Sequence, residues 1–154
     1  MDRFFAVFQN PFLIVALSSW FIAQVIKTIL HAVITGKFTI ERLFGDGGMP
    51  SGHSATVSSL AMLSGMVYGM DSFEFAVTAI LAVIVCHDAM GVRLETGKQA
   101  QLINEIQKAV EILSKKELPE VKLKEFVGHT PSQVIAGVTI GLINGVAFYF
   151  LFFA

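Results

Sequence analysis

The sequence is poor in the residues on which several classes of protein depend. Its 154 residues include one cysteine, Cys86, which lies in an apolar run. An intrachain disulfide and a thiolate metal cluster are therefore excluded, and the thiol is expected to act as a small buried apolar side chain. Charged residues make up only 15% of the chain, and the formal net charge is −1. Because a basic surface and a zinc-finger pattern are both missing, we expect no nucleic-acid partner.

The sequence also shows no internal repeat and has too few apolar segments for an inverted repeat, which disfavours a transporter. Only Arg3 precedes the first apolar run, and that run contains no clean small-residue cleavage site. A secretory signal is therefore not predicted, and the run is expected to remain as a membrane helix.

Hydrophobic residues are abundant: they make up 54% of the chain, and the mean hydropathy is +0.67. The apolar runs predict membrane helices at about 11–34, 51–69, 73–92 and 128–154. A charged segment before the last run predicts an amphipathic helix that ends near Ser114 and lies on the membrane surface or caps the bundle. The predicted fold class is all-α. We expect one domain, 1–154, forming an integral membrane helical bundle with about four transmembrane helices plus one amphipathic surface helix.

A glycine-rich turn, Gly47 to Ala55, ends in a histidine and runs directly into the second apolar segment. Several backbone N–H groups and the ring of His53 would meet at this helix start, which is the arrangement of a phosphate site. A turn that only connects two helices, with His53 near the cap, is the plainer interpretation.

A polar stripe interrupts the first apolar run at Gln24, Lys27, Thr28 and His31, which share one helical face. Lys27 could extend to the membrane surface, but its polar neighbours favour an inward-facing role.

Small residues recur along two of the predicted helices. Gly137, Gly141 and Gly145 repeat every four residues in the last helix, and Ser54 to Gly69 contains a similar stripe. Two helices packed through these stripes would bring His53 and His129 to the same end. Either stripe could instead pack between two copies, so a homo-oligomer is left open.

Ionisable residues end the third apolar run, where His87 and Asp88 are followed by Arg93. Residues of this kind at membrane depth indicate function, although a structural pair between Asp88 and an arginine is the alternative. Most lysines and arginines lie in the two polar segments on the side of these residues, and this asymmetry predicts a cytoplasmic location for that face.

One face therefore collects fixed cations, backbone donors and two histidines, which suits the transfer of a phosphoryl group. One histidine can attack phosphorus and the other can protonate the leaving oxygen, without a metal. A metal-dependent hydrolase that uses His53, His87, Asp88 and His129 is disfavoured, because their spacing matches no familiar metal site.

These residues resemble the type 2 phosphatidic acid phosphatase (PAP2) superfamily, and more closely its divergent branch related to acid phosphatase and vanadium-dependent haloperoxidase. The segment from Pro50 to His53, Pro-Ser-Gly-His, matches the second superfamily motif literally. His129 to Gly137 resembles the end of the third motif. Asp88 to Arg93 and Gly97 to Ala100 are similar to the signature of the divergent branch.

The resemblance implies that His129 is the nucleophile that forms a phosphohistidine and that His53 is the acid. It implies lipid phosphate or diphosphate substrates and no metal cofactor. The expected phosphate-binding groups are Lys27, Arg42, Arg93, Lys98, and the backbone N–H groups of Ser51 and Gly52.

Gln133 stands where the third motif has an aspartate. Its amide could orient the His129 ring by hydrogen bonding, and Asp88 could substitute for the missing carboxylate. The leading hypothesis is a membrane lipid phosphatase of the bacterial plasma membrane. The alternative, which Gln133 favours, is a membrane protein that binds phospholipid head groups without turnover.

Overall fold

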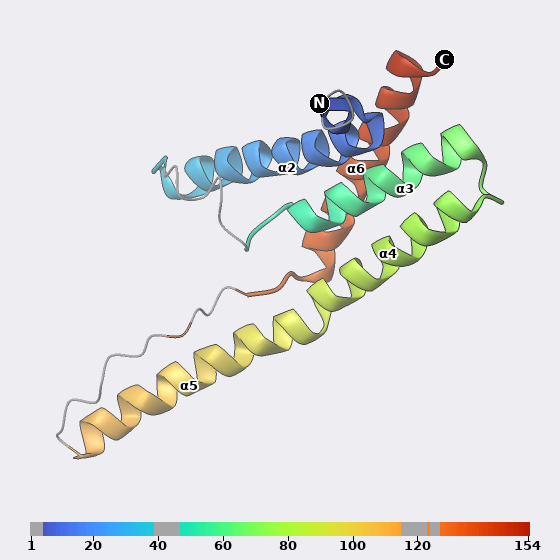
Figure 1. Cartoon of the computed structure of the whole chain (residues 1–154). Coiled ribbons are helices and arrows are strands. Elements are labelled where there is room, and N and C mark those ends of the chain that lie inside the picture. Colours follow the sequence, from blue (N-terminus) through green and yellow to red (C-terminus); the bar gives the residue numbers. More distant parts are fainter. Residues whose placement is uncertain (1–4, 39–46, 115–122, 124–126) are drawn as a thin grey trace.

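The computed structural model describes residues 5–38, 47–114, 123 and 127–154. In these ranges every regular element is a helix, so the predicted all-α class is confirmed. A short 3₁₀ helix, η1, is followed by five α-helices (Figure 1). Their bounds are Ala6–Gln9 for η1, Pro11–Thr35 for α2, Gly52–Tyr68 for α3, Phe73–Met90 for α4, Val92–Ser114 for α5 and Pro131–Phe152 for α6.

Three helices among the described residues are long and apolar enough to cross a membrane: α2, α6, and α4 together with α5. The fourth predicted span, α3, has 17 residues and forms the centre of the bundle, where it contacts α2, α4 and α6. More than half of its residues are buried, and most of these are small. In contrast, α4 buries only Ala89 and exposes half of its apolar side chains.

Polar caps set the starts of the helices. Asn10 accepts hydrogen bonds from two N–H groups of the first turn of α2, and Ser51 and Ser72 cap α3 and α4 in the same way. Thr130 and Gln133 form a capping box at the start of α6. Each cap satisfies backbone donors that the first helical turn leaves without a partner.

The glycine face of α6 packs directly on the backbone of α3. A Cβ atom on Gly137 would lie 2.3 Å from the Ser51 carbonyl oxygen, and one on Gly141 would lie 2.4 Å from that of Ala55. Only glycine permits this approach. The predicted pairing of the two small-residue stripes is therefore confirmed, and both helices begin at the same end of the bundle (Figure 1).

Aromatic contacts hold the opposite end together. The ring of Phe12, at the start of α2, stacks on Tyr68 at the end of α3 with 5.3 Å between centroids. It also lies 6.3 Å from the ring of Phe153, which follows α6. These contacts place the start of α2 beside the ends of α3 and α6.

A polar cluster joins α2 to α6 inside the bundle. The Asn144 amide donates hydrogen bonds to the hydroxyl oxygens of Ser18 and Ser19, at 2.9 and 2.8 Å. In a membrane such bonds contribute about 0.6–2 kcal/mol each, and they also fix the register of the helices.

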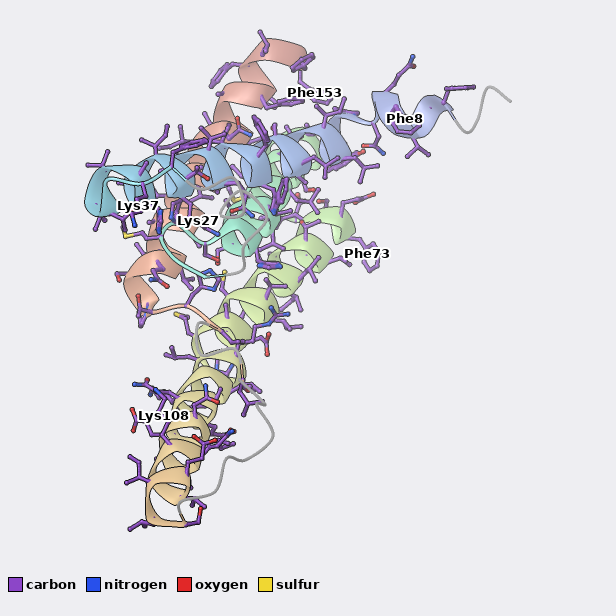
Figure 2. All side chains as sticks on the ribbon, turned by 90° about the vertical axis from the view of Figure 1, so that its left-hand side faces the viewer. Phe8, Lys27, Lys37, Phe73, Lys108 and Phe153 are labelled. Carbon is purple, nitrogen blue, oxygen red and sulfur yellow. The ribbon has the colours of Figure 1, made fainter. Side chains whose placement is uncertain are left out.

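The amphipathic helix is confirmed, and of its two expected places, the membrane surface and a cap on the bundle, the cap is wrong. It ends at Ser114 as predicted, yet α5 begins at Val92 and extends the direction of α4 away from the bundle (Figure 1). Figure 2, turned by 90°, shows Lys108 on this same projecting arm. Within the described residues α5 contacts no helix other than α4, so it does not cap the bundle.

We predict that Gly141→Ala destabilises the fold, because the added methyl group would overlap the Ala55 carbonyl of a neighbouring helix backbone. Forced overpacking of this kind costs about 1–3 kcal/mol. Thermal unfolding of the detergent-solubilised protein should show a lower Tm. The larger change Ala147→Leu, on the exposed face of α6, is the control and should leave Tm unchanged. Equal Tm values for the two variants would contradict the close packing.

Candidate active site

A cavity of about 210 Å³ lies at the end of the bundle where α3 and α6 begin. It has several times the volume of one water molecule. Four of its lining residues were predicted site residues, and they come from α3, the α4–α5 junction and the residues just before α6. The described residues that line it are His53, Ile84, Val85, Asp88, Ala89, Arg93 and His129.

His129 is fixed through its backbone. Its N–H donates a hydrogen bond to the Ala89 carbonyl oxygen at 2.9 Å, and the residue is only 4% exposed. The preceding Gly128 has φ +86° and lies so close to α5 that a Cβ atom would be 2.3 Å from the Leu94 N. This contact brings His129 beside Arg93, although nearly all of α5 separates the two in the sequence.

His53 is the second residue of α3, and its side chain is exposed. It lines both the 210 Å³ cavity and a second cavity between α2, α3 and α4. The pairing of α3 with α6 brings this ring to the same cavity as His129, as the small-residue stripes predicted.

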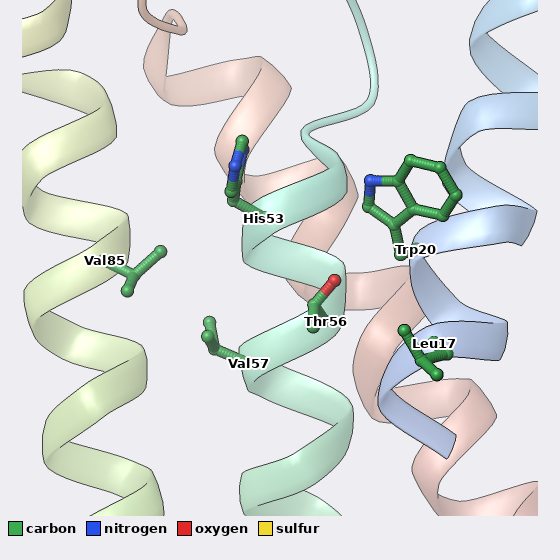
Figure 3. A pocket seen from close by; sticks show the side chains of 6 residues that line it. All are labelled: Leu17, Trp20, His53, Thr56, Val57 and Val85. Atoms are coloured by element: carbon green, nitrogen blue, oxygen red, sulfur yellow. The ribbon is translucent and has the colours of Figure 1, made fainter. Parts of the chain in front are cut away.

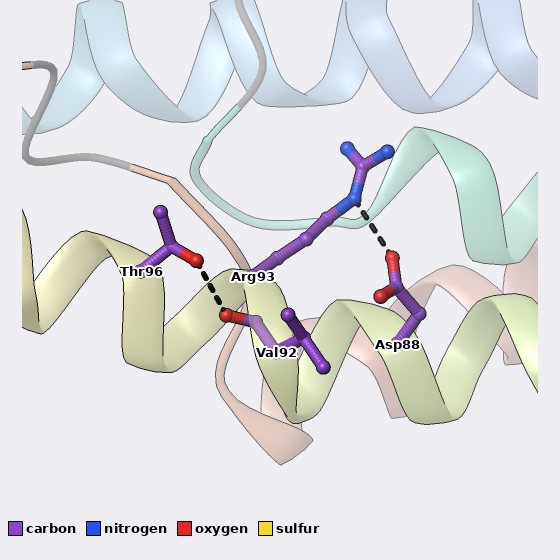
Figure 4. A network of polar contacts seen from close by, with 4 residues as sticks. All are labelled: Asp88, Val92, Arg93 and Thr96. Carbon is purple, nitrogen blue, oxygen red and sulfur yellow. Dashed lines mark hydrogen bonds and ion pairs between the residues drawn. The ribbon is translucent and has the colours of Figure 1, made fainter.

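Asp88 and Arg93 form an ion pair across Gly91, where α4 gives way to α5. The Arg93 Nε donates to the Asp88 Oδ2 at 2.9 Å, and both side chains are about half exposed. Figure 4 shows the terminal guanidinium nitrogens turned away from the carboxylate. The predicted structural pair is therefore present. The terminal guanidinium nitrogens of Arg93 point away from Asp88, where they can donate hydrogen bonds to another group.

The expected role of the Ser51 backbone is wrong. Its N–H donates to the Gln133 carbonyl oxygen at 3.0 Å, and the residue is fully buried, so this group is not available to a phosphate. Gly52 is also buried, with the indole of Trp20 packed against it. The backbone of Ser51, at the start of α3, thus joins α3 to α6.

Gln133 is engaged at the start of its own helix. Its Oε1 accepts a hydrogen bond from the Thr130 N–H at 3.0 Å, as part of the capping box. Only the NH₂ group of the amide is left to reach a ring nitrogen. Its predicted role in orienting His129 stays a prediction.

Two other predicted cations, Lys27 and Lys98, are not among the described lining residues of this cavity. Lys27 is 5% exposed, and its aliphatic stem packs beside Gly48 of the glycine-rich turn. Lys98 projects from α5 and forms an exposed ion pair with Glu95 at 2.6 Å. Arg42 lies outside the described residues.

The second cavity has a volume of about 390 Å³ and is largely apolar (Figure 3). The sequence did not single out its α2 residues, although Trp20 lies four positions before Gln24 and so extends the polar stripe of α2 onto the same face. The described lining residues are Leu17, Trp20, His53, Thr56, Val57 and Val85.

Across the described part of the chain, no three or more histidine, cysteine, aspartate or glutamate side chains are grouped so that they could hold a metal ion. The chemistry available at the 210 Å³ cavity is therefore that of two imidazoles, a guanidinium group and a carboxylate.

Comparison with known proteins finds relatives over most of the chain. Residues 8–144 match the family described as "Divergent PAP2 family". The chain is 36% identical over 140 residues to the "Uncharacterized membrane protein YuiD" of Bacillus subtilis (strain 168), covering 85% of this chain and 89% of that protein. No solved structure matches the chain significantly.

We predict that Gly128→Ala separates His129 from Arg93. The methyl group would meet the α5 backbone, which has no flexible end that could move aside. Hydrogen–deuterium exchange should show faster exchange of the His129 amide, because its bond to Ala89 is lost.

Gly36→Ala is the matched control for this experiment. Gly36 also has a positive φ, +67°, but a Cβ atom there would meet nothing within 4 Å. This variant incurs only the backbone penalty of about 1–2 kcal/mol. Unchanged exchange at His129 in Gly128→Ala would contradict the role of this contact.

Proposed function

The chain belongs to the divergent PAP2 family of membrane proteins, and from this premise we propose that it is a membrane phosphatase. Its substrate would be a lipid phosphate monoester or diphosphate, hydrolysed through a phosphohistidine intermediate. The observation that carries the proposal is the single cavity lined by His53, Arg93 and His129.

In the first step a ring nitrogen of His129 attacks phosphorus. A nitrogen–phosphorus bond forms and the ester phosphorus–oxygen bond breaks, while His53 donates a proton to the leaving oxygen. The products of this step are a free alcohol, or a monophosphate from a diphosphate substrate, and a phosphorylated His129. The buried position and backbone anchor of His129 support this assignment, because an attacking group must be held at a fixed place.

In the second step water attacks the phosphohistidine. The nitrogen–phosphorus bond breaks, His53 accepts the proton from the water, and inorganic phosphate leaves. Arg93 would stabilise the charge on the phosphoryl oxygens through its terminal nitrogens, and Asp88 would hold the guanidinium in place through Nε. The scheme requires no metal or other cofactor.

The second cavity supports a lipid as the substrate. It is apolar, and it meets the first cavity at His53 and Val85. A phosphate group placed near His129 would have its leaving oxygen at His53 and its apolar chain between α2, α3 and α4 (Figure 3). We further propose that membrane lipids surround the exposed side chains of α4.

The proposal includes an orientation in a bacterial plasma membrane, with the cavity end facing the cytoplasm. Among the described lysines and arginines, Arg93 lines the cavity, Lys98 and Lys108 lie on α5, and Lys37 follows the C-terminal end of α2. The positive-inside rule would place these positions on the cytoplasmic side. A reporter fused after Ala154 should then lie outside the cytoplasm.

We predict that His129→Ala and His53→Ala each abolish phosphate release, because one removes the nucleophile and the other the proton donor. Loss of a general acid alone costs about 10²–10⁴-fold in rate. Purified protein should be assayed on phosphatidylglycerophosphate, phosphatidate and a polyprenyl phosphate without added metal.

His87→Ala is the matched control, because His87 lies on α4 beside Asp88 but is not among the described lining residues of the cavity. It should keep the activity of the parent protein. Full activity in both His53 and His129 variants would rule out the proposed mechanism, provided that thermal unfolding shows all three variants to be folded.

We predict that Leu17→Trp weakens the use of long-chain substrates, because the larger side chain would fill part of the apolar cavity. KM should rise for a long-chain lipid phosphate, while hydrolysis of a short-chain, water-soluble phosphate ester should be unchanged. Leu13→Trp, also exposed on α2 but outside the described lining, is the control. An equal effect on both substrates would contradict the assignment of the apolar cavity to the lipid chain.

A second candidate function is favoured by the side chain of Gln133. Its amide oxygen caps α6, which is a structural role. A protein that binds a phospholipid head group in the same cavity without turnover would need no group to orient a nucleophile. It would show saturable binding of the lipid phosphate with no phosphate release, and Arg93→Ala would abolish that binding.

A further inference from the structure

The apolar cavity between α2, α3 and α4 contains a hydrogen-bond donor that the described residues leave unused. Trp20 of α2 lines this cavity, and the nitrogen-bearing edge of its indole faces the first turn of α3 (Figure 3). A Cβ atom on Gly52 would lie 3.2 Å from the Trp20 Cδ1 and 3.6 Å from its Nε1. Within the described part of the chain, the Trp20 N–H has no hydrogen-bond acceptor.

An indole N–H in such a place needs an acceptor. Leaving a polar group unpaired away from water is costly, so a buried tryptophan N–H is usually hydrogen-bonded, and membrane hydrocarbon offers no acceptor. Gln24 lies one turn further along the same face of α2, but its Oε1 is buried and bonds to no group of the described chain. The acceptor for Trp20 is therefore left to the molecule that occupies the cavity.

The other polar groups of the described lining are already engaged. The Thr56 hydroxyl donates its hydrogen to the Gly52 carbonyl oxygen at 2.8 Å. The ring of His53 lines both cavities, and in the proposed mechanism it protonates the leaving oxygen. Because the indole packs on Gly52, the residue just before His53, an acceptor for Trp20 would lie within a few bonds of that leaving oxygen.

Lipid phosphates differ in whether they carry an oxygen at this position. In a glycerol phosphate lipid, the carbon next to the phosphate-bearing carbon carries an oxygen, which is an acyl ester in phosphatidate and a free hydroxyl in phosphatidylglycerophosphate. In a polyprenyl phosphate, the same position and those beyond it are hydrocarbon. A polyprenyl chain in the cavity would therefore leave the Trp20 N–H unpaired.

We propose that Trp20 is a specificity-determining residue whose N–H donates a hydrogen bond to this oxygen of a glycerol phosphate lipid. The inference rests on the proposed function, because that function places the phosphate near His129 and the lipid chain in the apolar cavity. A site that bonds to a polar group of one substrate disfavours an analogue that lacks the group. Trp20 thus selects a glycerol phosphate over a polyprenyl phosphate.

Trp20→Phe tests this role, because it removes the N–H and keeps an aromatic ring. We would measure kcat/KM on dioctanoyl phosphatidate, phosphatidylglycerophosphate and farnesyl phosphate in detergent. The loss should be about 10-fold larger for the glycerol phosphates than for farnesyl phosphate, as expected for one hydrogen bond whose removal leaves an oxygen unpaired. Phe21→Leu is the control, because Phe21 is exposed and outside the described lining, and it should change none of the three values.

The two glycerol phosphates separate the two kinds of oxygen. A larger loss on both supports a bond to the oxygen in either form, and a larger loss on one of them assigns the bond to the ester or to the hydroxyl. An equal loss on all three substrates would show that the ring has only a structural role, and it would overturn the proposal. So would a parent protein that hydrolyses farnesyl phosphate more efficiently than both glycerol phosphates.

A binding measurement keeps this inference apart from the proposed function, which fails if the parent protein releases phosphate from none of these lipids. Trp20 is the only tryptophan in the chain, so the tryptophan fluorescence reports this position alone. A hydrogen bond donated by the indole N–H shifts the emission to longer wavelength. A saturable shift of this kind with dioctanoyl phosphatidate, and none with farnesyl phosphate, would support the contact without turnover. The same shift with both lipids, or a shift with neither, would overturn it.

Discussion

The close contact between α6 and α3 is the constraint on which the rest of the molecule depends. In a membrane the hydrophobic effect does not drive helices together, so association depends on close packing and on hydrogen bonds between helices. Glycines on α6 let its backbone touch the carbonyl oxygens of α3, and the Ser51 N–H joins the two helix starts through Gln133. Three glycines would weaken this helix in water. In lipid no water competes for the backbone N–H and C=O groups, so the hydrogen bonds within the helix are kept.

The candidate site follows from that contact together with a second one. The first contact sets His53 and the start of α6 at the same end of the bundle. The second, between Gly128 and the first turn of α5, places His129 beside Arg93. Between these two residues α5 leads away from the bundle, while Gly128 lies against its first turn.

Much of this arrangement is readable in the sequence, because it rests on local periodicity. The four-residue repeat of glycines matches the helical period, so it correctly predicted the pairing that brings His53 and His129 together. The Ser51 N–H was assigned wrongly, because its acceptor, Gln133, is distant in sequence and nothing local indicates that bond. The cap formed by Thr130 and Gln133 has a recognisable pattern, threonine followed three residues later by glutamine, which competes with the catalytic interpretation of Gln133. Amphipathicity indicated which face of α5 is apolar but not the direction in which the helix points.

The charges of the cavity lining bear on how an anion would enter it. Arg93 is balanced by Asp88 through their ion pair, so these two side chains together bring no net charge. Besides this pair, the described lining carries the imidazole rings of His53 and His129. A net positive cavity therefore requires a proton on one histidine. The proposed mechanism needs that same proton on His53, so the protonation state that attracts a phosphate is also the state in which the leaving oxygen can be protonated.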